Sequence, residues 1–380
     1  MVKFMYIIVQ GDIHMDKTRK NLNFIYVLKF VSSIIIAVFL HWNDHFIPNL
    51  GYSNIFTNRI LVFLTTRSYI LVELFFVISG LLYYINSNEK IKNNLISFKD
   101  FFVKKMGRLL PVIIFSSIVI FLCNVLLFAL GKNLWSCGST SIFELFISFF
   151  SGRMILGDRQ YLNAPIWYVN VLLLCFAIAY FLSKKSKKHK DILFLIPIVI
   201  SLFLLFNPIY IFNYNIIRGF ASFFIGIYTG KFLTIYNDYS DLKKEFVKII
   251  SLLLLIIYII IAYFGKINNF YNPESISYTL FVFVPLIIFL YDFKLLNKFF
   301  SFKIFKFLSD ISYSIYIWNF PILIALHLLY VFKIINFNIY SYKFFILLFI
   351  IHIIVGTLSY IFIEKKFKNV KFSLITKLLD

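Results

Sequence analysis

The sequence predicts an all-α integral membrane protein, a bundle of about ten transmembrane helices with both termini in the cytoplasm. Hydrophobic residues make up 61% of the 380 residues and charged residues only 14%, whereas soluble domains are about half apolar and about a quarter charged. Apolar stretches of about 20 residues recur along the chain, the length that a membrane-spanning helix needs. The loops between them alternate between rich and poor in basic residues. This composition excludes a soluble enzyme, a disordered chain and a disulfide-linked scaffold.

The apolar stretches predict spans because a bilayer core of about 30 Å takes about 17–25 helical residues to cross. Lipid satisfies no backbone polar group, and continuous apolar runs favour helices over barrel strands. The fifth and eighth stretches are the shortest. The apolar stretch 142–150 is too short to cross and is predicted to be interfacial or re-entrant. The predicted spans are 22–42, 69–86, 109–130, 165–182, 191–206, 216–235, 247–264, 276–291, 311–331 and 343–363.

The basic residues set the predicted orientation. Of the 38 lysines and arginines, 26 lie on the side of the N-terminus and eight on the other side, and cytoplasmic loops carry such an excess. The net charge of +21 therefore reflects topology, and no nucleic acid is expected as a partner. We expect a cytoplasmic segment 1–21, with Met1 or Met15 as its start, a membrane domain 22–363 and a basic cytoplasmic tail 364–380, all in or at the cytoplasmic membrane.

Few ionisable side chains lie within the predicted spans, where such groups are costly and by default functional. His41 ends the first span, and Glu73 lies about 6 Å below the outer end of the second, so we expect the two to meet, with Glu73 orienting His41 as a general base. The alternative is an interfacial histidine and a solvated carboxylate. Arg218 lies at a similar depth, where it would pair with Glu73, bind an anionic substrate or extend to the interface. Lys105 and Arg108 share a helix face at the inner end of the third span, where they would bind phosphates or only anchor the span.

Other polar residues of the spans are weaker candidates. Asn319 lies near mid-membrane, two residues before Pro321, which frees a backbone carbonyl one turn earlier. A polar, broken patch at that depth predicts a lined cavity. His327 and His352 have no carboxylate close in sequence and are predicted to be structural.

Four motifs, in order along the chain, resemble those of the acyltransferase-3 family of integral membrane acyltransferases. Weaker similarities are Pro165-Ile166-Trp167-Tyr168, Arg218 with Gly226 and Gly230, and Glu364, so the resemblance extends over nearly the whole chain. The motifs are Val38-Phe39-Leu40-His41, Glu73-Leu74-Phe75-Phe76-Val77-Ile78-Ser79-Gly80, Lys105-Met106-Gly107-Arg108-Leu109-Leu110-Pro111 and the stretch from Ser312 to Pro321.

The chain departs from the family at a few positions. Lys105 stands where an arginine is usual, Asn319 where many members carry histidine, and Lys366 where proline is common. With these departures the chain resembles the branch that acts on surface polysaccharides and related glycans of the bacterial cell envelope.

The resemblance implies an O-acyltransferase that moves an acyl group, most often acetyl, from cytoplasmic acyl-CoA to a hydroxyl of a cell-surface polysaccharide or lipid-linked glycan. The glycan-synthesis machinery is a further expected partner. Succinyl and longer acyl chains stay open, and the alternative function is a polysaccharide exporter or flippase component without acyl transfer. No metal is expected, because His41 and His45 have metal-binding spacing but no third ligand close enough to complete a site.

The resemblance also implies residue roles. His41, oriented by Glu73, would act as base on the hydroxyl or carry the acyl group, and Lys105 and Arg108 would hold the CoA phosphates. Arg218 would stabilise the oxyanion. Three further candidates for contact with the substrate or the oxyanion are Trp167, Tyr316 and Asn319, and for an aromatic residue at a membrane boundary the alternative is an aromatic belt. By topology the basic pair and His41 would be separated by most of the ~30 Å core.

Overall fold

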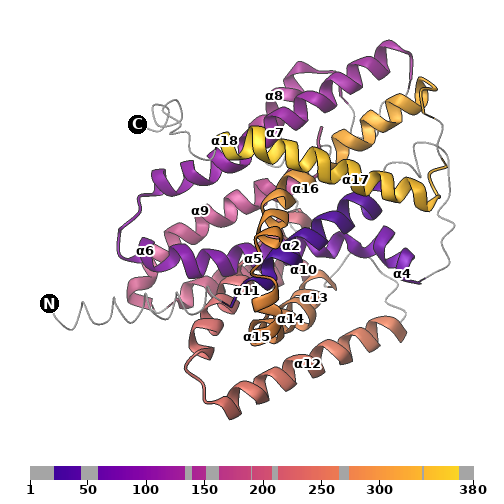
Figure 1. Cartoon of the computed structure of the whole chain (residues 1–380). Helices are drawn as coiled ribbons and strands as arrows, with labels where there is room; N and C mark the ends of the chain where they lie inside the picture. Colours follow the sequence, from indigo (N-terminus) through magenta and orange to yellow (C-terminus); the bar gives the residue numbers. More distant parts are fainter. Residues whose placement is uncertain are drawn as a thin grey trace. The chain divides into compact units, whose positions relative to one another are not determined.

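The computed structural model describes residues 21–43, 59–132, 139–150, 162–189, 191–207, 213–264, 274–335 and 338–367. All regular secondary structure in these ranges is helical (Figure 1). The chain forms two compact units, each assembled from segments far apart in sequence. Unit 1 comprises 1–28, 72–98 and 171–306, and unit 2 comprises 29–71, 99–170 and 307–380. The predicted boundaries at residues 21 and 363 stay predictions.

Unit 1 contains most of the central part of the chain. Helix α9 contributes its first residues, 166–170, to unit 2. The elements of unit 1 are α5 (Leu71–Tyr83), η4 (Tyr84–Asn88), α6 (Glu89–Lys92), α9 (Ile166–His189), η6 (Ile192–Phe194), α10 (Leu195–Phe206), α11 (Tyr214–Tyr236), α12 (Asp241–Phe264), α13 (Glu274–Tyr278), η7 (Thr279–Phe283), α14 (Val284–Tyr291) and α15 (Lys294–Phe299).

Glycines bring two helices of unit 1 into backbone contact. A Cβ at Gly80 of α5 would overlap the carbonyl oxygen of Phe223 in α11, and one at Gly226 of α11 would overlap that of Val77. Small residues at such crossings let membrane helices approach closely. A Cβ at Gly230, one turn beyond Gly226, would contact the turn after Val77. Helices α5 and α11 therefore run in the same direction, as the second and sixth spans of an alternating topology do.

Unit 2 contains the N-terminal and C-terminal parts of the described chain. Helix α2 begins in unit 1 and enters unit 2 at residue 29. The elements of unit 2 are α2 (Phe24–Ile35), η1 (Ile36–Leu40), α4 (Arg59–Val62), η2 (Phe63–Arg67), η3 (Ser68–Ile70), α7 (Phe98–Ala129), α8 (Ile142–Phe150), α16 (Lys303–Val331), α17 (Tyr342–Ser359), η8 (Tyr360–Glu364) and α18 (Lys365–Phe367).

The core of unit 2 forms where η1, α16 and α17 meet. Buried apolar side chains from these elements, among them Val38, Ile315 and Leu348, form one cluster. Trp42 is fully buried against this cluster, and its indole Nε1 donates to the carbonyl of Ile339 at 3.2 Å. A buried indole N–H needs such a partner. The packing and this bond hold the end of the first helix, and with it residue 41, against α16 and α17.

Seven described helical segments are long and apolar enough to cross a membrane. Predicted spans 191–206 and 276–291 correspond to shorter apolar helices, Ile192–Phe206 and Ile276–Tyr291, and span 247–264 lies in α12. A multi-pass membrane protein is supported, whereas ten crossings and cytoplasmic termini stay predictions. The seven segments are Phe24–Asn43, Ile60–Lys92, Phe98–Ala129, Ile166–Ser186, Tyr214–Tyr236, Lys303–Val331 and Tyr342–Phe367.

The second helical segment begins at residue 60, nine residues before the predicted start at 69. The hydroxyl side chains in this stretch bond within the helix. Thr65 donates to the carbonyl of Leu61 at 2.8 Å, and Ser68 donates to that of Leu64 at 2.6 Å. Such bonds to the preceding turn let Ser and Thr lie in apolar surroundings.

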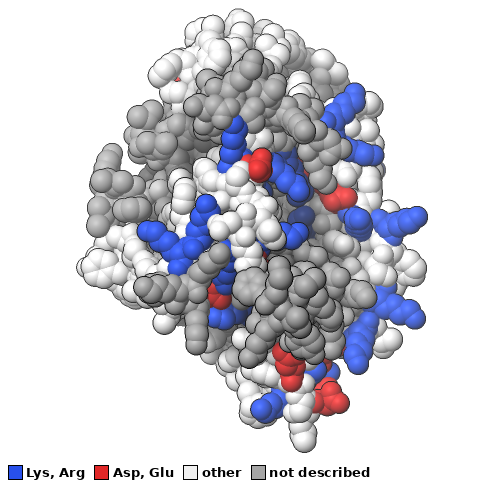
Figure 2. Space-filling model, turned by 90° about the vertical axis from the view of Figure 1, so that its left-hand side faces the viewer, with Lys and Arg blue, Asp and Glu red and all other residues white. Residues whose placement is uncertain are grey.

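Lysine and arginine side chains predominate over carboxylates on the face shown in Figure 2. This excess reflects the whole chain, in which 38 lysine and arginine residues outnumber 17 aspartate and glutamate residues.

Candidate active site

Residues of the first and fourth motifs meet in unit 2. His41 follows η1, and its ring lies 4.5 Å from the ring of Phe320, measured between centroids. The neighbouring Asn319 is fully buried, and its amide lies close enough to His41 for a polar interaction. His41 also interacts electrostatically with His352 of α17. The structure therefore places an amide and a phenyl ring beside the predicted base, with a second imidazole within electrostatic range.

The proline of the fourth motif creates a polar site beside this patch. Pro321 lacks an N–H, which leaves the carbonyl of Ile317 without its helical donor. The amide Nδ2 of Asn163 donates to that carbonyl at 3.1 Å and lies 3.1 Å from the hydroxyl of Ser116. Asn163 is fully buried. The freed carbonyl expected from the sequence is thus present, and Asn163 satisfies it.

The third and fourth motifs meet the end of the last span at a second polar cluster of unit 2. Arg108 Nε lies 2.8 Å from Glu364 Oε1, and the other carboxylate oxygen accepts from Ser314 at 3.3 Å. Glu364 is nearly fully buried, whereas the Arg108 side chain is 38% exposed. In Lys105, one turn earlier, the ammonium lies 5.4 Å from the Phe101 ring centre. Arg108 therefore neutralises a buried carboxylate while more than a third of its own side chain stays exposed.

A short stretch of α16 connects the two clusters of unit 2. Ser314, which bonds to Glu364, and Asn319, beside His41, are five residues apart on α16. Five helical residues rise about 7.5 Å. This rise is shorter than the expected separation of His41 from the basic pair by most of the ~30 Å core, which stays a prediction. Glu364, at the end of η8, contacts α16 at Ser314, and linear counting from the span boundaries could not reveal this contact.

Glu73 and Arg218 form a buried ion pair within unit 1. Arg218 Nε lies 2.8 Å from Glu73 Oε1, with side-chain exposures of 7% and 0%. The guanidinium also lies over the ring of Tyr214, 5.7 Å from its centre. Of the three roles considered for Arg218, pairing with Glu73 is the one observed. His41 belongs to unit 2, so its expected meeting with Glu73 stays a prediction.

The aromatic candidates lie near the start of α9 and in α16. The ring of Tyr316 packs edge-on against Tyr168, with centroids 5.6 Å apart. Tyr316 is buried, and Trp167, next to Tyr168, is partly exposed. A sugar-stacking role for Trp167 and Tyr316 remains a proposal.

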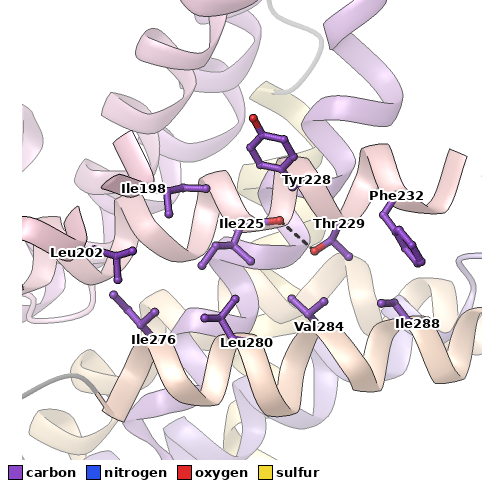
Figure 3. A pocket seen from close by; sticks show the side chains of 10 residues that line it. All are labelled: Ile198, Leu202, Ile225, Tyr228, Thr229, Phe232, Ile276, Leu280, Val284 and Ile288. Carbon is purple, nitrogen blue, oxygen red and sulfur yellow. Dashed lines mark hydrogen bonds between the residues drawn. The ribbon is translucent and has the colours of Figure 1, made fainter. Parts of the chain in front are cut away.

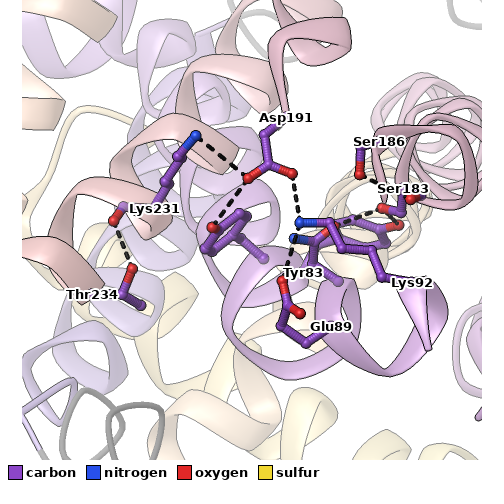
Figure 4. A network of polar contacts seen from close by, with 10 residues as sticks. Tyr83, Glu89, Lys92, Ser183, Ser186, Asp191, Lys231 and Thr234 are labelled. Carbon is purple, nitrogen blue, oxygen red and sulfur yellow. Dashed lines mark hydrogen bonds and ion pairs between the residues drawn. The ribbon is translucent and has the colours of Figure 1, made fainter. Parts of the chain in front are cut away.

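Asp191 is a charged centre that the sequence did not single out. It lies in the turn before α10 with a left-handed φ of 67° and accepts two cations, Lys92 at 2.6 Å and Lys231 at 3.4 Å. Tyr228 donates to its backbone carbonyl at 2.9 Å. Figure 4 shows the carboxylate between the two lysines. Asp191 connects α6, the α9–α10 turn and α11 of unit 1. Its three partners are distant in sequence, so no local sequence pattern indicated this cluster.

An apolar groove of about 420 Å³ also lies in unit 1 (Figure 3). It is formed by α10, α11 and the helical segment from α13 to α14. Its lining includes Leu202, Ile225 and Leu280 but none of the residues predicted for catalysis.

The described residues also bear on metal binding. They contain no group of three or more His, Cys, Asp or Glu side chains placed to hold a metal ion. His45, considered with His41 as a metal ligand, lies outside the described residues.

Comparison with known proteins agrees with the motifs. The acyltransferase-3 family, described as an acyltransferase domain, matches residues 22–364. No curated protein and no solved structure matches the chain. The family match covers the His41 patch, the Arg108–Glu364 cluster and the Glu73–Arg218 pair in one continuous domain. The chain therefore belongs to the acyltransferase-3 family and is a membrane acyltransferase.

Proposed function

We propose that this membrane acyltransferase moves an acyl group, in the first instance acetyl, from acyl-CoA to a hydroxyl of a bacterial cell-surface polysaccharide or lipid-linked glycan. The observation that carries the proposal is the position of His41 in unit 2. Its imidazole lies in a buried polar patch about 7.5 Å in helical rise from the cluster that contains Arg108. The reaction needs a base and a phosphate-binding cation that one acyl-CoA molecule can reach at the same time.

The proposed chemistry uses one ring nitrogen of His41 as general base. That nitrogen takes the proton of the acceptor hydroxyl while the hydroxyl oxygen attacks the carbonyl carbon of the thioester. The carbon–sulfur bond of the tetrahedral intermediate then breaks, and the CoA sulfur leaves with the proton that His41 returns. A route through an acyl-imidazole on His41 has the same balance and requires the acyl group to be transferred twice.

The donor site is proposed at Arg108 and Lys105. The guanidinium of Arg108 already has a carboxylate at Nε, and the Arg108 side chain is 38% exposed whereas that of Glu364 is buried. Planar guanidinium groups bind phosphate oxygens in pairs. In this arrangement Glu364 and Ser314 hold Arg108 in position, and the short rise along α16 lets the pantetheine arm carry the acyl group to His41.

Glu73 and Arg218 are proposed to act together. A fully buried carboxylate paired with a buried guanidinium is an expensive arrangement for a membrane protein to keep without a use. The neutralised pair would present the N–H groups of Arg218 to the negative charge that develops on the carbonyl oxygen of the acyl group. The role of Glu73 as orienter of His41 is the alternative.

The proposal is tested by the ester content of the surface glycan. Deletion of the gene should remove O-acyl esters with polymer export unchanged, and the wild-type gene should restore them. His41→Ala, inserted in the membrane at the wild-type level, should fail to restore them. Full restoration by His41→Ala would contradict the proposal. Loss of surface polymer with its esters retained would instead favour the exporter.

A further inference from the structure

Four buried polar atoms of unit 2 have no hydrogen-bond partner among the described residues, and they belong to side chains of neighbouring helices. Asn319 and His352 lie one helical turn from Ile315 and Gly356, and a Cβ at Gly356 would contact Ile315. Within the described part of the chain, no hydrogen bond of good geometry reaches His41 Nδ1, either polar atom of the Asn319 amide, or His352 Nε2. Asn319 and His352 are fully buried, and His41 interacts with both. Buried polar groups in proteins are nearly always paired, so this set needs an explanation.

The backbone determines the tautomer of His352. Its Nδ1 lies 2.7 Å from the carbonyl oxygen of Leu348, one turn earlier in α17. A carbonyl only accepts, so Nδ1 carries the hydrogen, and in the neutral ring Nε2 then has only a lone pair. His352 therefore offers an acceptor to the interior of the unit, and a donor must face it.

The Asn319 amide complements both histidines. Its NH₂ group supplies the donor that His352 Nε2 lacks, and its carbonyl supplies an acceptor for an N–H at His41 Nδ1. The oxygen and nitrogen of an amide are assigned from such a network, and only one orientation satisfies all four atoms. Phe320, the next residue, packs against the His41 ring.

We infer that His352 and Asn319 are positioning residues for His41, forming a chain in which the Asn319 amide donates to His352 Nε2 and accepts from His41 Nδ1–H. The inference rests on the proposed role of His41. The chain holds His41 in one tautomer, with the lone pair on Nε2, the nitrogen left to take the proton of the acceptor hydroxyl. His352, predicted from the sequence to be structural, thus acts on the reaction through Asn319.

Two substitutions at His352 separate this role from a structural one. In His352→Asn, the shorter amide keeps the bond to the Leu348 carbonyl but does not reach Asn319. In His352→Gln, the longer side chain places a carbonyl oxygen near the former Nε2 position and gives up the bond to Leu348. We expect His352→Asn to lower kcat about tenfold, part of the 10²–10⁴ that general base catalysis contributes, with KM for acyl-CoA unchanged. His352→Gln should recover most of that loss.

The opposite order would overturn the inference, because a structural histidine needs the bond to Leu348 and tolerates the loss of the acceptor. Wild-type rates in both variants, or equal losses in both, would also overturn it. His327→Asn, on α16 but outside this chain of residues, is the matched control and should keep the wild-type rate. Membrane insertion and thermal unfolding of each variant establish that it is folded.

Coupling between the positions gives a second test. If His352 acts through Asn319, then His352→Asn should have no further effect in an Asn319→Leu background, and additive losses would contradict the chain. A third readout needs no activity. The ¹⁵N resonances of the histidine ring nitrogens, in the purified full chain in nanodiscs, should show His41 as the Nδ1–H tautomer in the wild type and as a mixture in Asn319→Leu.

These readouts distinguish failure of the inference from failure of the proposed function. Loss of esters in His41→Ala with no effect at His352 would reject the positioning chain and leave the base. Retention of esters in His41→Ala would reject the proposed function, and the ring-nitrogen resonances would still decide whether the chain of hydrogen bonds exists.

Discussion

The buried ion pair between Glu73 and Arg218 allows a quantitative test of how unit 1 is held together. Solvent screening is negligible for this pair, because the side chains are 0% and 7% exposed and the α5–α11 crossing is closed by backbone contact at Gly80 and Gly226. Removing one partner of such a pair costs about 3–5 kcal/mol, since the other charge stays buried and uncompensated. An exposed pair would be worth about 0–1 kcal/mol.

The perturbation is a double-mutant cycle with Arg218→Met, Glu73→Gln and the double variant. We expect Arg218→Met to lower the free energy of unfolding by about 3–5 kcal/mol and the double variant by much less, because neutral side chains of similar size bury without that penalty. The assay is unfolding of the purified protein by a denaturing detergent in mixed micelles. The coupling energy, the departure from additivity, should be about 2–4 kcal/mol.

Additive losses would refute this reasoning, since they would mean that each charge finds other partners or water when its counterpart is removed. If Arg218→Met lowered the free energy of unfolding by less than about 1 kcal/mol, the pair would contribute no more than a solvent-exposed ion pair does. Ile217→Met, at the neighbouring buried position of α11, is a suitable control for the general effect of inserting methionine into this helix.

Three further predictions concern packing, the proline site and the donor site. Gly226→Ala should lower stability by about 1–3 kcal/mol, the usual cost of overpacking, because its Cβ overlaps the Val77 carbonyl; thermal unfolding measures this, and a wild-type midpoint would contradict the close contact. Asn163→Leu should cost about 1–3 kcal/mol by leaving the carbonyl freed by Pro321 unsatisfied, and adding Pro321→Ala, which restores the helical donor, should recover part of the loss. Arg108→Lys should raise KM for acyl-CoA by about tenfold with kcat nearly unchanged, because lysine keeps the charge but loses paired binding to phosphate; an effect on kcat alone, in assays of donor saturation, would contradict a donor-binding role.

The candidate site was partly predictable from the sequence because its members lie in short motifs. His41, Glu73 and Arg218 were identified by the cost of placing ionisable groups among apolar residues, and the carbonyl freed by Pro321 followed from the missing N–H of proline. Asn163 and Asp191 were not found, because an amide or a carboxylate in a loop is ordinary until its partners are known. His352 was predicted to be structural because no carboxylate is close in sequence, and the role inferred for it depends on Asn319 of another helix.

The sequence by itself determined the class of the protein, because hydrophobic composition, span length and the distribution of basic residues depend on one property of the bilayer, its low capacity for polar groups. It also determined which side chains were worth examining. Only the tertiary structure decided their partners: Arg218 pairs with Glu73, Arg108 with Glu364, and His41 lies with Asn319 and His352. Which residues on different helices become partners depends on how those helices pack and how far each is displaced along its axis. Small residues and buried contacts set this displacement, and only the three-dimensional structure shows them.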